Sequence, residues 1–124
     1  MRKLLVTDDS MIIRELVKDV ARRDGWEIVG EAADGQQAVE QYQRLRPDGV
    51  TLDLVMPHFD GLHALRGIKA VDADAKVLVV SAIDQADVLR EAVKLGASDF
   101  VVKPFEETRL QKALDLLAPF SDSK

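Results

Sequence analysis

Short apolar runs alternate with amphipathic segments along the chain. The runs at 4–6, 28–32, 50–56, 76–81 and 100–102 are bounded by turn-forming or polar residues, which is typical of short strands. The 76–81 run is apolar almost throughout, as expected for a strand that is covered on both faces. The pattern therefore predicts strands in these places, each followed by a helix.

The segments between the runs carry apolar residues at helical spacing. Ser10 is a candidate N-cap for the first helix, and Gly25 is expected to end it. The inward face of this helix is predicted to consist of Ile12, Ile13, Leu16, Val17 and Val20. Later helices are expected to begin at Asp34-Gly35, Asp60-Gly61 and Asp84, and a last one to end before Pro119. This alternation predicts an α/β domain with a mostly parallel sheet and helices on both faces.

Polar residues stand where several predicted strands end. Asp8 and Asp9 follow the first strand, Asp53 lies in the third, and the fourth and fifth lead to Ser81 and Lys103. The carboxyl ends of parallel strands share one edge of a sheet, and ligands bind at that edge in open α/β sheets. These side chains are therefore expected to converge around Asp53.

Such a group of residues has a recognisable chemistry. Carboxylates that lie close together repel one another, and a hard divalent cation such as Mg²⁺ or Mn²⁺ relieves this repulsion with oxygen ligands alone. Lys103 adds a positive charge and Ser81 a hydroxyl donor. The combination predicts a phosphoryl-transfer site in which Asp53 is the nucleophile and Asp8 and Asp9 hold the metal.

Composition excludes several other classes of protein. The length of 124 residues suits one domain spanning 1–124, and the net charge of -5 argues against binding to nucleic acid. There is no cysteine, hence no disulfide framework or thiolate metal site. No apolar run is long enough for a signal peptide or a membrane span. We expect a cytoplasmic monomer that binds neither nucleic acid nor membranes.

These motifs resemble the receiver domain of two-component response regulators. The resemblance rests on Asp8-Asp9, Asp53 with Met56-Pro57 and Asp60-Gly61, Ser81-Ala82, and Gly96-Ala97 before Lys103-Pro104-Phe105. The resemblance covers about 3–118. Within the family, the chain is most similar to the single-domain chemotaxis receivers of the CheY type, because little chain remains for an output domain. It implies a flavodoxin-like (βα)5 three-layer sandwich whose parallel sheet has the strand order 2-1-3-4-5.

The resemblance also implies a role for each site residue. Asp53 would accept a phosphoryl group from a phosphohistidine of a sensor kinase. Mg²⁺ would be bound directly by Asp9, Asp53 and the backbone carbonyl of Val55, and through water by Asp8. Outside this self-phosphorylation and its reversal, the protein is not expected to be an enzyme.

The resemblance also implies which residues transmit the signal to a partner. Ser81 and Lys103 would contact the phosphoryl group, and Phe100 matches the family's switch aromatic, which turns inward as the Ser81 hydroxyl moves. The face formed by the fourth helix, fifth strand and fifth helix would then change its affinity for a partner. The implied partners are a CheA-like kinase, a downstream protein such as the flagellar motor switch, and a phosphatase.

Two features depart from the family pattern. The positions two residues after the phosphoacceptor and two after the serine are often polar in the family, but here they are Val55 and Ile83. An apolar pair cannot orient an attacking water, which predicts slow self-dephosphorylation. Phe100 in place of tyrosine keeps the steric switch and loses a hydroxyl group.

The same residues are also compared with the requirements of three alternative functions. A haloacid-dehalogenase-like phosphatase would also use Asp53, but it needs a second aspartate at the position of Val55. A receiver-like scaffold could bind partners without phosphorylation, although the complete set of site residues argues against it. The chain could also be the receiver of a larger regulator.

Overall fold

The computed structural model describes residues 1–56, 61–82 and 86–118. The predictions for Pro57, Asp60, Ile83, Asp84 and Pro119 lie outside these residues. No helix in the described part of the chain is long and apolar enough to cross a membrane.

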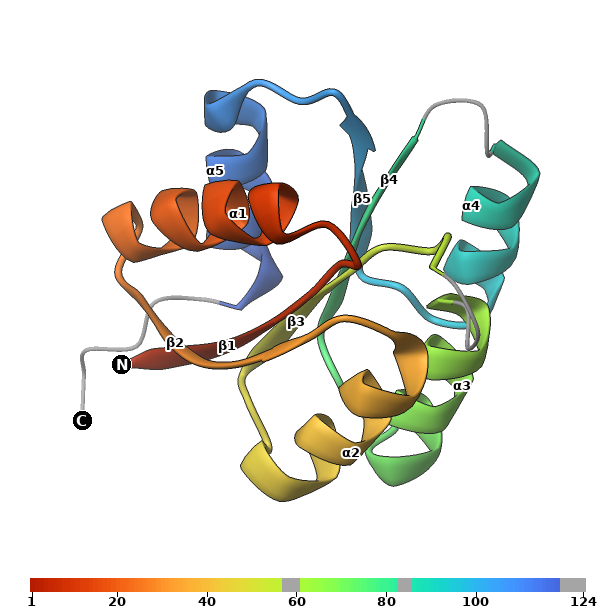
Figure 1. Ribbon diagram of the computed structural model, residues 1–124. Coiled ribbons are helices and arrows are strands. Elements are labelled where there is room, and N and C mark those ends of the chain that lie inside the picture. Colours follow the sequence, from red (N-terminus) through yellow and green to blue (C-terminus); the bar gives the residue numbers. More distant parts are fainter. Residues whose placement is uncertain (57–60, 83–85, 119–124) are drawn as a thin grey trace.

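Strands and helices alternate strictly through the described residues (Figure 1). The strands are β1 (Arg2–Thr7), β2 (Trp26–Ala32), β3 (Gly49–Leu52), β4 (Val77–Ala82) and β5 (Asp99–Lys103). The helices are α1 (Met11–Arg23), α2 (Gly35–Leu45), α3 (Gly61–Val71), α4 (Ala86–Lys94) and α5 (Glu107–Leu117). The α/β class predicted from the pattern is confirmed.

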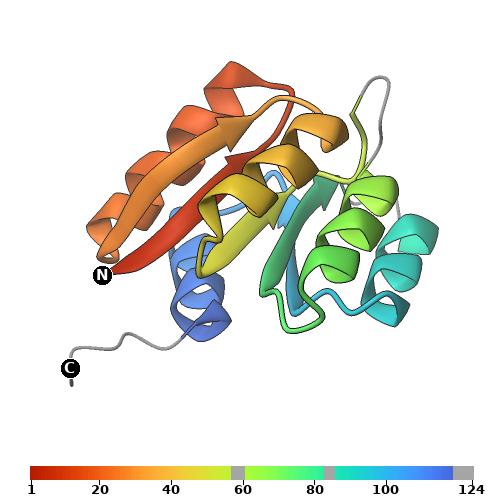
Figure 2. The same ribbon diagram turned by 90° about the horizontal axis from the view of Figure 1, so that it is seen from below.

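The strands form one parallel sheet in the order β2-β1-β3-β4-β5, and they lie side by side in this order in Figure 2. Helices α1 and α5 cover one face of the sheet, while α2, α3 and α4 cover the other (Figure 1). This is the flavodoxin-like sandwich that the family resemblance implied. Alternation alone did not fix the strand order.

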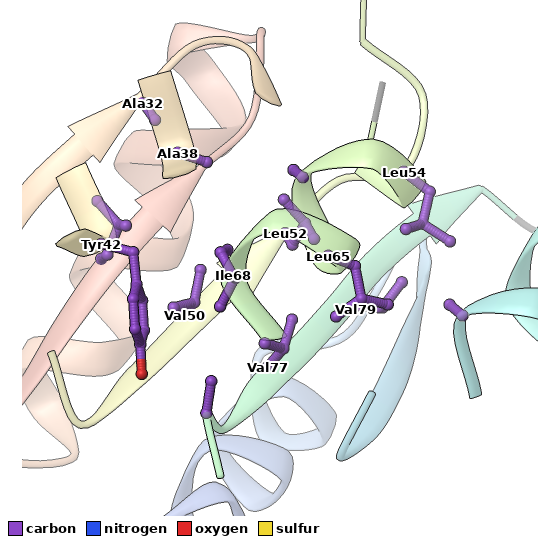
Figure 3. Close-up of a cluster of buried hydrophobic side chains, with 14 of the residues drawn as sticks. Ala32, Ala38, Tyr42, Val50, Leu52, Leu54, Leu65, Ile68, Val77 and Val79 are labelled. Atoms are coloured by element: carbon purple, nitrogen blue, oxygen red, sulfur yellow. The ribbon is translucent and has the colours of Figure 1, made fainter. Parts of the chain in front are cut away.

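Each face of the sheet has its own apolar core. Side chains alternate between faces along a strand, so Leu5 packs toward α2 and α3, while Leu4 and Val6 pack toward α1 and α5. In β4, Val77 and Val79 likewise belong to the cluster drawn in Figure 3. A strand that is covered on both faces needs apolar residues at successive positions, which explains the uninterrupted 76–81 run.

The boundaries of α1 agree with the prediction, but its inward face does not. The Ser10 hydroxyl accepts a hydrogen bond from the Ile13 amide and caps the helix. Ile12 and Leu16, which were expected to face inward, are 71% and 40% exposed. The prediction was wrong because the five apolar positions cover an arc wider than the contact with the sheet. The inner stripe consists of Ile13, Val17, Val20 and Ala21.

The third strand is shorter than its apolar run. It was predicted over 50–56, but β3 ends at Leu52, so Asp53 follows the strand. Leu54 and Met56 are nevertheless buried in the core on the α2 and α3 side. Their burial produces the apolar pattern without any strand pairing, which explains the wrong boundary.

Arg2 links three segments at the end of the sheet where the parallel strands begin. Its guanidinium carbon lies 4.4 Å from the ring centroid of Trp26, in a cation–π contact. One guanidinium nitrogen donates to the Ala118 carbonyl at 2.9 Å, and the other lies 3.3 Å from the Asp24 carboxylate. These contacts join the start of β1 to the end of α1 and the end of α5.

Candidate functional site

Hydrogen bonds beyond the strand ends build the carboxyl edge of the sheet. Thr7 pairs with Leu52 at the end of the β1–β3 ladder. One residue later, the Asp53 amide donates to the Thr7 carbonyl at 3.1 Å, and the Asp8 amide donates to the Ala32 carbonyl at 3.1 Å. Asp8 and Asp53 are therefore held side by side just above the sheet.

Three carboxylates meet at this edge. Asp8, Asp9 and Asp53 each offer one oxygen, and these oxygens all lie within 4.8 Å of one another. Asp8 and Asp53 are buried, whereas Asp9 is exposed. An oxygen-only set that is open on one side fits a hard divalent cation such as Mg²⁺, which keeps several places for water or phosphate oxygens. For these three carboxylates, the convergence predicted from the strand ends is confirmed.

Lys103 neutralises part of this negative charge. Its ammonium group lies 2.7 Å from Asp8 Oδ2 and 3.4 Å from Asp53 Oδ2. Burial favours the neutral amine, but the hydrogen bond to Asp8 and the charge of Asp53 outweigh burial and raise the pKa of Lys103. The lysine is therefore a fixed positive charge at neutral pH. It ends β5 and is followed by a cis peptide bond to Pro104.

The surroundings of Asp53 disfavour its ionised form. Burial is the largest effect, and together with the neighbouring charge of Asp8 it raises the pKa of Asp53. The charge of Lys103 and the hydrogen bond from the Val55 amide act in the opposite direction without cancelling this shift. A cation at the cluster would favour the ionised carboxylate, because opposite charges stabilise each other at short distance.

The carboxylate oxygens of the three aspartates differ in the number of hydrogen bonds that they accept from the protein. Asp8 Oδ1 accepts from the Ser10 amide at 2.9 Å, and its Oδ2 accepts from Lys103. Asp53 Oδ1 accepts from the Val55 amide at 3.2 Å. No hydrogen bond to the Asp9 carboxylate is found within the described residues. Asp9 is thus the aspartate whose oxygens are most available to a ligand.

Val55 lies next to the cluster with a half-exposed side chain. Its amide contacts Asp53, as expected for a loop that folds back on the carboxylate. The role implied for its backbone carbonyl as a metal ligand stays a prediction. Slow self-dephosphorylation also stays a prediction.

Ser81 lies at the same edge of the sheet, on the neighbouring strand. It is fully buried in β4 and stands opposite Val102, one residue before the Ala82–Lys103 pair. Val79, two residues earlier, pairs with Leu52. The register therefore places Ser81 beyond the end of β3, near the level of Asp53. Its contact with a phosphoryl group stays a prediction.

Phe100 lies on β5, three residues before Lys103, and it is 38% exposed. The resemblance implies an inward position in the phosphorylated state, and the side chain is not in that position here. Its switch role stays a prediction. The ring contributes to an apolar hollow between α4 and β5, which is also lined by Ala86, Leu89, Arg90, Val93, Lys94 and Val102.

Arg14 is a residue near the site that the sequence reasoning missed. Its guanidinium donates to the Asp8 backbone carbonyl at 2.7 Å and to Glu31 at 2.9 Å. One turn later, Lys18 is buried and donates to the same carboxylate. Two basic residues four positions apart, beside the buried stripe of α1, were the available signal.

Comparison with known proteins agrees with this geometry. The response regulator receiver domain family matches residues 4–115. The chain belongs to this family. The receiver is 42% identical to the chemotaxis protein CheY of Thermotoga maritima over 114 residues, which are 92% of this chain and 95% of that protein. It is 45% identical to CheY of Listeria monocytogenes over 118 residues, 95% of this chain and 99% of that protein.

A solved structure gives the same result for the fold. The receiver matches a chain in the crystal structure of the CheX–CheY–BeF3–Mg²⁺ complex from Borrelia burgdorferi with a TM-score of 0.88 and 30% identity. The match covers 94% of this chain and 88% of that chain. The receiver is therefore a homologue of CheY in both sequence and fold. The resemblance stated from the motifs is confirmed.

Proposed function

We propose that this receiver is a cytoplasmic, monomeric switch in a chemotaxis pathway and that Asp53 carries its phosphoryl group. The observation that supports the proposal is the cluster of Asp8, Asp9 and Asp53 beside Lys103 at one edge of the sheet. This arrangement combines a nucleophile, a cation site and a fixed positive charge. Phosphoryl transfer needs these three elements because catalysis consists mainly of positioning and charge neutralisation.

Asp9 and Asp53 are assigned as direct Mg²⁺ ligands, together with the Val55 carbonyl. Asp8 is assigned a water-mediated contact, since both of its oxygens already accept hydrogen bonds from the protein. Bound Mg²⁺ would neutralise charge on the phosphoryl oxygens. The exposed carboxylate of Asp9 leaves the cation accessible from solvent, as a phosphodonor requires.

The chain's own groups account for the transfer. A carboxylate oxygen of Asp53 forms the new P–O bond while the P–N bond to the donor histidine breaks. Lys103 is assigned to the phosphoryl oxygens, and its contacts with Asp8 and Asp53 keep its ammonium group at the required place. The Ser81 hydroxyl is assigned as a hydrogen-bond donor to the same group. The protein catalyses only this step and its hydrolytic reversal.

Partner binding is assigned to the face that contains α4 and β5. Phe100 and Val102 line an apolar hollow there, beside α4. Movement of Phe100 would change the shape of this hollow and so its affinity for a downstream protein. A histidine kinase would supply the phosphoryl group, and a phosphatase would remove it.

The chemistry is tested by intact-mass measurement after incubation with acetyl phosphate and Mg²⁺. The wild-type protein should gain one phosphoryl group, with no gain in EDTA. Asp53→Asn should gain none, because its amide is not a nucleophile. Asp34→Asn is the matched control, since Asp34 caps α2 and asparagine caps helices equally well.

Two results would contradict the proposal. One is a phosphoryl adduct that persists in Asp53→Asn, which would place the acceptor elsewhere. The other is a wild-type protein that binds Mg²⁺ but gains no mass, even with a histidine-phosphorylated kinase as donor. That second result would favour a scaffold that works without phosphorylation.

A further inference from the structure

Arg14 joins the loop that carries the metal-binding pair to the second strand. Its Nη1 donates to the Asp8 backbone carbonyl at 2.7 Å, and its Nε donates to Glu31 Oε1 at 2.9 Å. Lys18 donates to the other oxygen of Glu31 at 2.7 Å. We call the group formed by Arg14, Lys18 and Glu31 the Glu31 clasp. It connects α1, β2 and the loop between β1 and α1.

The Glu31 clasp is partly shielded from water and fully charged. The exposed fractions of its side chains are 17% for Arg14, 9% for Lys18 and 38% for Glu31. The hydrogen bond from Lys18 is the largest effect on Glu31, and with Arg14 it lowers the pKa of that carboxyl despite burial. An isolated ion pair at the surface contributes little to stability. A carboxylate that accepts a hydrogen bond from a different basic side chain at each of its oxygens holds both side chains in a fixed geometry.

The carbonyl that Arg14 holds is well placed to control the metal site. The Asp8 carbonyl belongs to the peptide unit that joins Asp8 to Asp9, and this unit is planar. A hydrogen bond to that oxygen therefore fixes the orientation of the backbone at Asp9. Asp8 has three further restraints, through its amide, Ser10 and Lys103. The Asp9 side chain is exposed and has no comparable hydrogen bond within the described residues.

We propose that Arg14, held in place by Glu31, is a positioning residue that directs the Asp9 carboxylate toward Asp53 and thereby sets the affinity for Mg²⁺. The inference rests on the metal site of the proposed function. Groups that orient metal ligands are commonly worth about 10–100-fold in metal affinity. Arg14 acts through the main chain, so we expect an effect near the lower limit, about tenfold.

Electrostatics alone predicts the opposite sign. Removing a positive charge near a cation site lowers the repulsion between protein and metal, so it should strengthen Mg²⁺ binding. The positioning role predicts that Mg²⁺ binding becomes weaker. A single affinity measurement thus distinguishes the two effects.

The experiment is isothermal titration of the metal-free protein with MgCl2. Arg14→Met keeps the length of the side chain and removes all its donors, and its dissociation constant should rise about tenfold. Arg14→Lys keeps the charge but cannot bridge Asp8 and Glu31 in the same way, so it should also bind more weakly. Arg23→Met is the matched control, because Arg23 lies on the same helix, is 62% exposed and pairs with Glu107.

A second readout separates binding from chemistry. The initial rate of phosphorylation by acetyl phosphate is measured as a function of Mg²⁺ concentration. In Arg14→Met the half-saturating Mg²⁺ concentration should rise about tenfold, while the rate at saturation stays within about twofold of the wild type. Saturating metal restores the site because Asp53 and Lys103 are unchanged.

The outcomes are distinct. Equal or tighter Mg²⁺ binding in Arg14→Met would overturn the inference, even if the variant melts at a lower temperature, since that would indicate a structural role only. If Arg14→Met does not fold, Arg14→Lys decides by the same criterion. A wild-type protein that shows no Mg²⁺ binding would overturn the metal site and the inference together, while Mg²⁺ binding with an unaffected Arg14→Met would overturn the inference alone.

Discussion

The aspartates of the site have the same chemistry but different surroundings. Asp53 is buried and carries a raised pKa, Asp8 has a hydrogen bond at each oxygen, and Asp9 faces solvent. Environment assigns different roles to identical side chains when it changes their charge and their free lone pairs. Here it separates the buried residue proposed as the nucleophile, Asp53, from Asp8, whose oxygens are already hydrogen-bonded, and from Asp9, the solvent-facing residue proposed as a direct metal ligand.

Asp9→Ala should remove most of the stabilisation by Mg²⁺. If free Mg²⁺ stands about tenfold above its dissociation constant, binding to the folded state adds about 1.4 kcal/mol to the free energy of unfolding. For a chain of this size that corresponds to a rise of about 5 °C in Tm. Scanning calorimetry with and without Mg²⁺ should show this rise in the wild type and little of it in Asp9→Ala.

Asp19→Ala is the control for that measurement, because Asp19 is exposed on α1. It should keep the full response to Mg²⁺. A rise in Tm that is equal in Asp9→Ala and in the wild type would show that Asp9 is not a ligand.

At the scale of elements, α1 has two functions. Its inner stripe packs on the sheet, and only the N-cap residue Ser10 separates its first turn from the acidic pair. The same helix therefore supplies Arg14 to the loop and Val17 to the core. Its exposed apolar residues, Met11, Ile12 and Leu16, contribute little to the core.

Two alanine substitutions on this helix should differ clearly in stability. Val17 is 2% exposed, and its truncation leaves a cavity, so Val17→Ala should cost about 2 kcal/mol of unfolding free energy. Ile12 is 71% exposed, and Ile12→Ala should change stability by less than about 0.5 kcal/mol. Urea unfolding of both variants measures this difference. Equal losses would mean that the apolar arc expected from the pattern, with Ile12 inside, is the correct one.

The sequence supported the existence and order of the elements better than their faces and ends. Apolar periodicity located α1 but could not show that Ile12 and Leu16 lie outside the contact with the sheet. The apolar run at 50–56 led to a predicted third strand that was too long at its carboxyl end. The strand ends at Leu52, and Leu54 and Met56 are buried without strand pairing. Burial and hydrogen bonding produce the same apolar pattern, so the pattern alone does not separate them.

The candidate site was predictable to a similar extent. Strand ends share an edge in a parallel sheet, which was enough to bring Asp8, Asp53 and Lys103 together. Arg14 could not be found in this way, because it acts on a backbone carbonyl rather than on a motif side chain. The different surroundings of the aspartates also depend on loop geometry, which residue types do not determine.

At the scale of the whole molecule, the strand order explains where the site lies. The chain leaves β1 toward β2 at one side and returns to β3 at the other, so the connections diverge above β1 and β3. Ligands bind at such points in open α/β sheets because the loops leave a crevice there. Asp8, Asp9 and Asp53 stand at this crevice.

The pH dependence of global stability should show the contribution of Glu31. Its pKa in the folded protein is below the ordinary value of 4.5, so it stabilises the fold above that pH and the contribution is lost as pH falls through the lowered pKa. Since the side chain is partly exposed, the contribution should be on the order of 1 kcal/mol or less. In EDTA, the unfolding free energy of Glu31→Gln should fall less steeply below pH 4.5 than that of the wild type. Parallel curves would contradict a charged clasp.

Trp26 is the only tryptophan in the sequence, and it lies at the start of β2 against Arg2. The strands are parallel and the acidic cluster lies at their carboxyl ends, so the indole ring and the site occupy opposite ends of the sheet. Ultraviolet emission from this indole therefore follows the unfolding of the whole domain and does not respond to events at Asp53. The same optical signal can rank the stability of every variant above, whereas an added fluorophore near the site is needed to observe ligand binding.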